Sequence, residues 1–202
     1  MTVNLSSLPF ALDWDGGVEP PVWSAAENGL EATAAPRTDW YAYAGLPAHA
    51  PSDAVKLLGT PPDGDWRFSA RFKVGFKSTY DAGALLLVID DDHWAKFAFE
   101  YSPEGTGMIV SVVTRGVSDD ANGWTVEGEH VWLRASRIGP AFALHASDDG
   151  ERWEFVRCFG FGVEGPVRAG LSVQSPIGEG CEAVIDEVAF TTETLRDLRD
   201  GS

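Results

Sequence analysis

Alternation of apolar and polar residues runs through the middle of this 202-residue chain and predicts β-strands. The clearest example is 65–74, DWRFSARFKV, in which every second residue is apolar and most residues between them are basic. A period of two places the apolar residues on one face of a strand and the polar residues on the other. We expect the apolar face to be core and the cationic row to be the solvated back of a sheet, rather than an anion site.

Residues 80–101, YDAGALLLVIDDDHWAKFAFEY, predict a hairpin around a tight acidic turn. The first arm, 84–89, is continuously apolar, which is typical of a strand covered on both faces. The second arm alternates between an aromatic face and a mixed face made of Trp94, Lys96, Ala98 and Glu100. If Phe97 and Phe99 are core, then the indole, the ammonium and the carboxylate of the mixed face point outward together.

Turn signals separate the remaining strands. Asn28-Gly29, within 22–34, predicts a hairpin with a type I′ turn, because both positions tolerate a positive φ. The acidic stretch 118–123 predicts a loop, 45–51 a surface crossing or the rim of a site, and 192–200 a short terminal helix. Further strands are expected at 109–115, 131–137, 141–145, 153–158, 167–175 and 182–190.

About ten to twelve short strands without helices between them predict an all-β fold, either a two-sheet antiparallel sandwich or a barrel. No repeat of 20 to 50 residues is visible, which disfavours a propeller or a solenoid. Residues 1–202 are long enough for one domain with a substantial core.

The formal net charge of −16 argues against partners such as nucleic acids and anionic membrane surfaces, since both repel an acidic protein. The first residues carry no basic segment and no long apolar run, and no later run approaches the ~20 apolar residues of a membrane span. We therefore expect a cytoplasmic protein in which Cys158 and Cys181 are reduced and buried. Neither cysteine belongs to a CxxC or Cys/His cluster, so we expect no structural zinc and no cofactor.

Five groups of residues, taken in order, resemble one known family. They are Thr38–Tyr41, Tyr80-Asp81, Trp94–Glu100, Val112–Arg115 with Ser118-Asp119, and Ser175-Pro176 with Gly178 and Gly180. From about Leu8 to Phe190 the chain resembles the DUF1349 family of concanavalin A-like proteins. The resemblance implies a jelly-roll sandwich of two antiparallel sheets, one of them with a concave outer face. The chain departs from the family pattern at Ala82, where glutamine is common, and at Asp120, where an aromatic residue is common.

A groove on that concave face would collect most of the candidate ligand-binding residues. They are Asp39, Trp40, Tyr41, Tyr80, Asp81, Trp94, Lys96, Glu100, Arg115 and Gln174, with Ser172 as an alternative to Gln174. Aromatic rings beside fixed polar groups suit a saccharide, because a sugar has an apolar C–H face and many hydroxyls that need partners. The alternative is that Lys96 and Glu100 form an exposed ion pair of ~0–1 kcal/mol on a solvated face.

Catalysis has weaker support than binding. Jelly-roll glycosidases usually carry two carboxylates on one strand, as in a Glu-x-Asp-x-x-Glu run, and none is present. The adjacent Asp186 and Glu187 would point to opposite faces unless a bulge intervenes. Glu100 could still pair through space with Asp81 or Asp39, with Lys96 holding one carboxylate ionised.

Two other functions remain open. The turn residues Asp90, Asp91 and Asp92 with His93 offer oxygen ligands for calcium, although their spacing matches no EF-hand loop. No histidine lies beside a Gly-x-Ser-x-Gly elbow, and His145 is expected to be structural. The leading hypothesis is a carbohydrate-binding module, followed by a carbohydrate-active enzyme using Glu100 as acid or base, and then a protein-interaction module.

Overall fold

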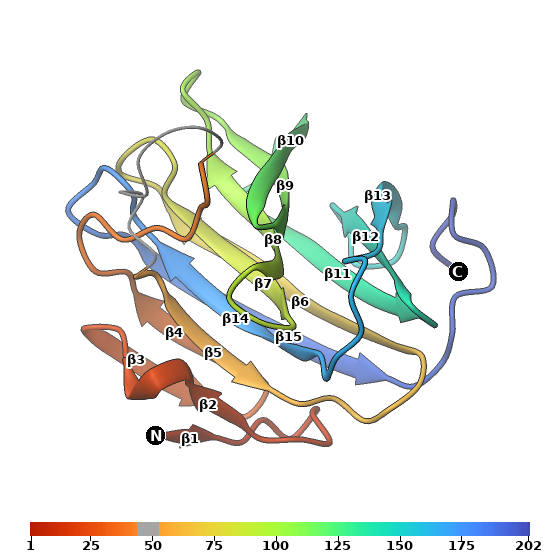
Figure 1. Cartoon of the computed structure of the whole chain (residues 1–202). Coiled ribbons are helices and arrows are strands. Elements are labelled where there is room, and N and C mark those ends of the chain that lie inside the picture. Colours follow the sequence, from red (N-terminus) through yellow and green to blue (C-terminus); the bar gives the residue numbers. More distant parts are fainter. Residues whose placement is uncertain (44–52) are drawn as a thin grey trace.

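The computed structural model describes residues 1–43 and 53–202, which form two antiparallel sheets (Figure 1). The eight-stranded sheet runs in the order β1 (Thr2–Val3), β2 (Leu12–Trp14), β5 (Val55–Gly59), β14 (Arg168–Gln174), β7 (Ala82–Val88), β8 (His93–Tyr101), β9 (Gly107–Arg115) and β10 (Val117–Thr125). The seven-stranded sheet runs in the order β13 (Glu154–Phe159), β12 (Ala141–Ser147), β11 (His130–Ile138), β6 (Trp66–Gly75), β15 (Glu182–Thr191), β4 (Gly29–Thr33) and β3 (Val22–Ala26). A 3-10 turn, η1 (Asp15–Gly17), follows β2.

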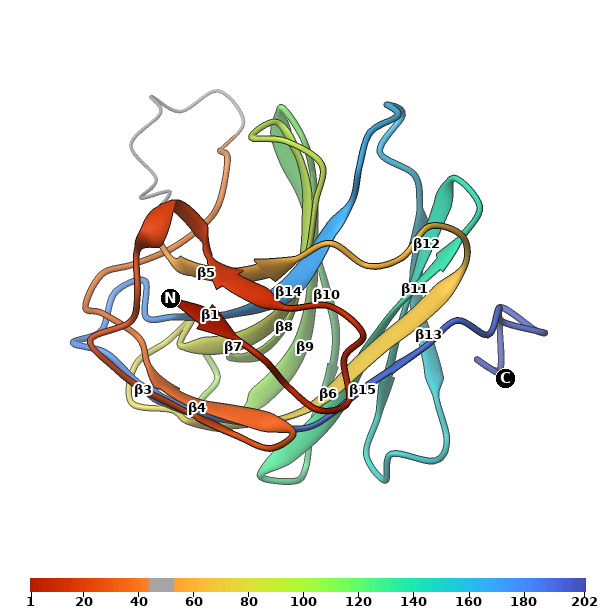
Figure 2. The ribbon, with the colours of Figure 1, turned by 90° about the horizontal axis from the view of Figure 1, so that it is seen from below.

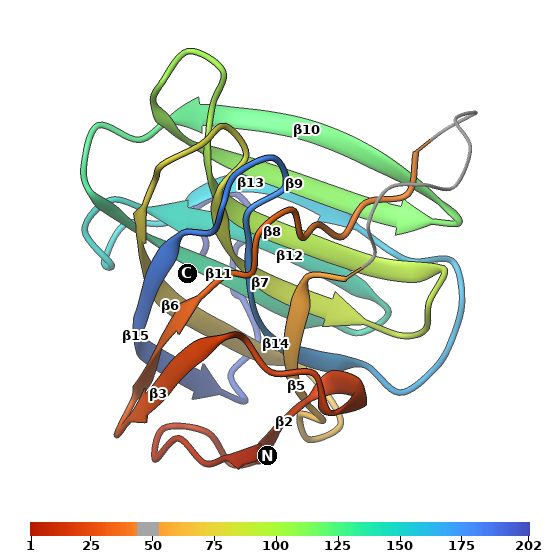
Figure 3. The ribbon, with the colours of Figure 1, turned by 90° about the vertical axis from the view of Figure 1, so that its left-hand side faces the viewer.

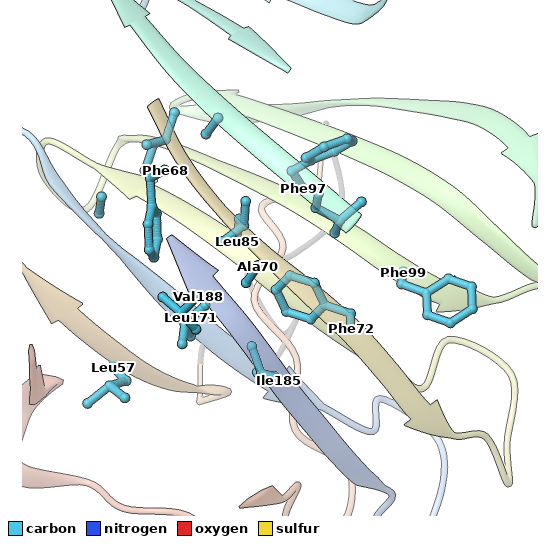
Figure 4. Packing of buried hydrophobic residues seen from close by; sticks show 14 of the residues in the cluster. Leu57, Phe68, Ala70, Phe72, Leu85, Phe97, Phe99, Leu171, Ile185 and Val188 are labelled. Carbon is cyan, nitrogen blue, oxygen red and sulfur yellow. The ribbon is translucent and has the colours of Figure 1, made fainter. Parts of the chain in front are cut away.

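The sheets pack face to face, so the predicted antiparallel sandwich is confirmed. Figure 2 shows the two layers, with β4, β6 and β15 in one and β5, β7 and β8 in the other. Figure 4 shows Phe68 and Phe72 of β6 and Phe97 and Phe99 of β8 in the core between them. Each of these rings is at most 1% exposed. The strand parity predicted for both segments is therefore correct.

A second apolar cluster lies on the outer face of the eight-stranded sheet. It includes Trp40, Leu86, Val88 and Trp94, and it explains why β7 is apolar on both faces. Residues 34–43, the segment after β4, cross this face and cover part of the cluster (Figure 3). The Ala42 carbonyl oxygen accepts a hydrogen bond from the Ser118 amide on β10. The predicted rim at 45–51 lies outside the described residues.

Two of the predicted elements are wrong. The expected loop 118–123 is part of β10, an edge strand whose backbone pairs with β9 although its side chains are mostly exposed. The expected helix at 192–200 consists of turns and extended chain. Such a segment is shorter than the ~12–15 residues an isolated helix needs in water. The C-terminal residues pack instead on β11 and β12, where the Arg134 guanidinium donates to the Gly201 carbonyl oxygen and His145 Nε2 contacts the Leu198 carbonyl oxygen.

The β3–β4 hairpin forms as predicted, but its turn is of another type. Glu27 and Asn28 make the turn, and neither they nor Gly29 has a positive φ. Gly29 is needed for close packing, because a Cβ there would lie 2.5 Å from the carbonyl oxygen of Ile185. Thus the glycine lets β4 approach β15.

Cys158 and Cys181 are unpaired, as predicted, although only Cys181 is buried. Burial raises the pKa of the Cys181 thiol to about 12, so it stays protonated. Within the described ranges, none of the elements is a helix long and apolar enough to cross a membrane.

Candidate functional site

A pocket of about 310 Å³ opens on the outer face of the eight-stranded sheet. Its polar floor comes from β8 and β14, one wall comes from β9 and β10, and the segment after β4 contributes Asp39, Tyr41 and Tyr43. Its lining consists of Asp39, Tyr41, Tyr43, Tyr80, Lys96, Glu100, Val110, Val112, Asp120, Gln174, Pro176 and Ile177. Six of the predicted site residues therefore meet in one place.

Lys96 is buried beneath the pocket and fully hydrogen-bonded. Its Nζ atom donates to Gln174 Oε1 at 2.8 Å, to the Trp40 carbonyl oxygen at 3.0 Å and to Asp39 Oδ1 at 3.1 Å. An ammonium group has three N–H donors, and these acceptors use all of them. Lys96 therefore ties the segment after β4 to β8 and β14, and has no donor left for a ligand.

Glu100 is 8% exposed, and its side chain faces the pocket from the same side of β8 as Lys96. Within residues 1–43 and 53–202, no group donates a hydrogen bond to its carboxylate, and Lys96 forms its ion pair with Asp39 instead. The predicted alternative, a Lys96–Glu100 ion pair, is therefore not formed. The pKa of Glu100 is raised to about 7, chiefly by burial; the charge of Lys96 lowers it, and the charges of Asp120 and Asp39 contribute to the rise.

Three tyrosines provide the aromatic surface of the pocket. Tyr41 and Tyr43 lie together, with ring centroids 4.6 Å apart. Burial, and next the charge of Asp120, raise the pKa of the Tyr41 hydroxyl. Tyr80, on the other side, is 40% exposed and has φ 71°, a conformation that bulky residues rarely adopt.

Asp81, the next residue, ties together the turn before β7 and does not line the pocket. Its Oδ2 atom accepts hydrogen bonds from the backbone amides of Lys77 and Ser78, both at 2.9 Å. Its Oδ1 atom accepts the Ser175 hydroxyl at 2.6 Å. Because the carboxylate is fully buried and both of its oxygens already accept hydrogen bonds, the predicted Glu100–Asp81 pair has no support from the structure.

Trp40 and Trp94 lie on the predicted face but offer no free ring to a ligand. Their rings stack on each other with centroids 3.9 Å apart, and they are 5% and 1% exposed. The Nζ atom of Lys56 lies 4.6 Å from the centroid of Trp40. The expectation that the two indoles supply stacking surfaces is therefore corrected: Trp40, on the segment after β4, covers Trp94 on β8, and each ring is used by the other.

Arg115 is the predicted site residue that lies on the wrong face. Arg115 lies opposite His93, whereas Trp94 and Lys96 lie opposite Thr114 and Val112. Because side chains alternate along a strand, Arg115 points to the other face of the sheet. Its Nε and Nη2 atoms donate to the Gly160 carbonyl oxygen. Ser172 lies on the pocket side, but its hydroxyl donates to the Val55 carbonyl oxygen, so Gln174 is the pocket residue of β14.

Asp120, noted in the sequence as a departure from the family pattern, was not among the predicted ligand-binding residues but lines the pocket. It lies opposite Val112 in the β9–β10 register, and both residues line the pocket. Loss of hydration in the pocket wall raises the pKa of its carboxyl, although Lys96 lowers it. The sequence does indicate this position: a one-residue connection at Gly116 fixes the register between β9 and β10, provided that 117–125 is read as a strand. Tyr43, Pro176 and Ile177 were also missed.

The other candidate chemistry lies away from the pocket. Asp90 Oδ1 accepts the backbone amides of Asp92 and His93 and contacts His93 Nδ1, so it caps its own turn. No group of three or more histidine, cysteine or acidic side chains in the described part of the chain could hold a metal ion. A bulge at β15 turns Asp186 and Glu187 to the same face, where both bind Arg71.

A family model described as "Protein of unknown function (DUF1349)" matches residues 17–193. "Regulation of enolase protein 1" of Saccharomyces cerevisiae is 26% identical over 155 residues, which cover 74% of this chain and 76% of the yeast protein. A crystal structure of a functionally unknown protein from Saccharomyces cerevisiae superposes with a TM-score of 0.78 at 20% identity, covering 90% of this chain and 96% of that one.

Similar solved structures also include carbohydrate-active proteins. The carbohydrate binding module CBM66 from Bacillus subtilis has a TM-score of 0.54 at 12% identity, covering 84% of this chain and 90% of that chain. The xylan beta-1,4-xylosidase from Bacillus halodurans C-125 has a TM-score of 0.64 at 14% identity, covering 87% of this chain but 35% of that chain. At these identities the comparison establishes a common sandwich fold.

Proposed function

The chain belongs to the DUF1349 family, and from that premise we propose that its pocket binds a carbohydrate or a similar polyhydroxylated small molecule. One observation carries the proposal: the Glu100 side chain is 8% exposed, its carboxylate opens only into a pocket of about 310 Å³, and that carboxylate has no donor among the described residues. A buried acceptor without a partner is costly, and a ligand hydroxyl can supply the missing hydrogen bond.

The walls of the pocket also suit such a ligand. Tyr41, Tyr43 and Tyr80 present aromatic surface for the C–H face of a sugar ring. Gln174 and Asp120 are fixed polar groups within the same lining. The fold shared with a carbohydrate binding module agrees with this proposal, although fold alone does not assign a ligand.

We expect a thermal-shift screen of neutral and charged saccharides to identify a ligand that stabilises the protein. Glu100→Ala should weaken binding of that ligand at least ~10-fold, since a lost hydrogen bond to a charged group is worth ~1.5–3 kcal/mol. The control is Glu129→Ala, which removes an exposed carboxylate next to β11. A broad library without a stabilising saccharide, or equal binding by both variants, would refute the proposal.

A second candidate function, glycoside hydrolysis with Glu100 as general acid, is favoured by the pKa of about 7. A general acid works best when its pKa lies near the working pH, and Asp120 lines the same pocket as a second carboxylate. We expect turnover of 4-nitrophenyl glycosides by the wild-type protein, with kcat/KM falling above about pH 7 as the acid loses its proton. Glu100→Gln should abolish that turnover and retain sugar binding. A binding module would show no turnover in either protein.

A further inference from the structure

The charged groups that line the pocket do not balance. Lys96 is the only Lys or Arg side chain in the lining formed by the described residues, and its charge is already paired with Asp39. Glu100 and Asp120 remain as carboxylates without an ion-pair partner in that lining. Arg157 is close to β10, but its Nη2 atom pairs with Asp119 Oδ2 at 2.8 Å.

The aromatic lining adds to the same preference. The electron-rich faces of tyrosine rings attract cations, and three tyrosines line the same pocket as the two carboxylates. Such a combination of rings and acidic groups suits an ammonium group better than a hydroxyl, because a charged donor forms shorter and stronger hydrogen bonds to a carboxylate. It disfavours an anionic ligand, which would meet like charge in a confined space.

We infer that the pocket selects a polyhydroxylated ligand that carries a protonated amine, with Glu100 and Asp120 binding the ammonium group and the tyrosines surrounding it. This inference rests on the proposed function and names its ligand class. A divalent metal ion is a poorer occupant, because the described residues bring together no group of three or more acidic, histidine or cysteine side chains that could hold one.

A cationic ligand should also change the protonation of the site. The groups around Glu100 are Lys96 on its own strand, Asp39 from the segment after β4, Asp120 from β10, and the three tyrosines. At neutral pH, Glu100 is protonated in a fraction of the protein molecules, because its pKa is about 7. Since an ammonium group favours the ionised carboxylate, its binding should release protons, whereas binding of a neutral sugar should not.

The test uses three monosaccharides that differ in charge: D-glucosamine, D-glucose and D-glucuronate, titrated into the full chain at pH 7 by calorimetry. We expect D-glucosamine to bind at least ~10-fold more tightly than D-glucose, and D-glucuronate to bind most weakly. Titrations in two buffers of different ionisation enthalpy should show proton release with D-glucosamine alone. Glu100→Gln should remove the preference and the proton release, whereas Glu129→Gln, outside the pocket, should leave both unchanged.

Other outcomes separate this inference from the proposed function. If D-glucose binds as tightly as D-glucosamine, the inference is overturned and the carbohydrate site stands. If 2-aminoethanol, an amine without a sugar ring, binds as tightly as D-glucosamine, the carbohydrate proposal fails and a general amine site remains. Absence of binding by all four probes would overturn both.

Discussion

Replacing Lys96 by methionine is expected to destabilise the fold by about 3–5 kcal/mol, because the partly buried Asp39 carboxylate loses its counter-ion and two further acceptors lose their donor. Methionine keeps much of the volume of the lysine stem but cannot donate hydrogen bonds. Asp39 Oδ1, the Trp40 carbonyl oxygen and Gln174 Oε1 would each lose a donor at once. The loss should appear as a lower midpoint of urea unfolding with an unchanged m-value.

An exposed lysine provides the matched control. Lys73 Nζ pairs with Glu129 Oε2 at 2.7 Å, but the two side chains are 56% and 81% exposed. Lys73→Met should therefore cost no more than ~1 kcal/mol. Asp39→Asn in the Lys96→Met background should recover part of the loss, since the amide removes the uncompensated charge. A Lys96→Met variant as stable as the control would show that the ammonium does not hold the segment after β4 in place.

Strand parity was predictable because the patterns in 65–74 and 94–101 are local and follow the period of the backbone. Phe97, Phe99, Lys96 and Glu100 consequently lie on the faces expected of them. The partners of Lys96 were not predictable in the same way. Its three acceptors come from Asp39, Trp40 and Gln174, more than 50 residues away along the chain.

The same limit explains why Trp94 was expected to face a ligand. Its outward direction follows from alternation, but its burial depends on Trp40, which reaches it only when the segment after β4 crosses the sheet.

Asp120 was not predicted as a pocket residue for a different reason. An edge strand can be polar along most of its length, so β10 carries no alternation that would predict it. The residues of a binding surface assembled from several segments can therefore be identified only when the fold is known.

Glu100→Gln is expected to stabilise the protein by about 3 kcal/mol at pH 8 and to change its stability little near pH 4.5. The carboxyl has an ordinary pKa of 4.5 and a pKa of about 7 in the folded protein. Between these values, the folded protein retains a proton that the unfolded chain has lost, so stability falls as the pH rises from about 4.5 to about 7. Glutamine keeps the shape of the side chain and does not ionise.

The measurement is urea unfolding of both proteins from pH 4.5 to 8.5. Glu129→Gln is the matched control with the opposite sign, because the hydrogen bond from Lys73 lowers the pKa of Glu129 and favours its ionised form. That variant should gain no stability at pH 8. A Glu100→Gln curve parallel to wild type would show that Glu100 is hydrated and normally acidic, and hence not a buried acceptor awaiting a ligand. If Glu100→Gln gains stability at pH 8 and also loses the preference for an amine, then the Glu100 carboxylate destabilises the fold and serves ligand binding.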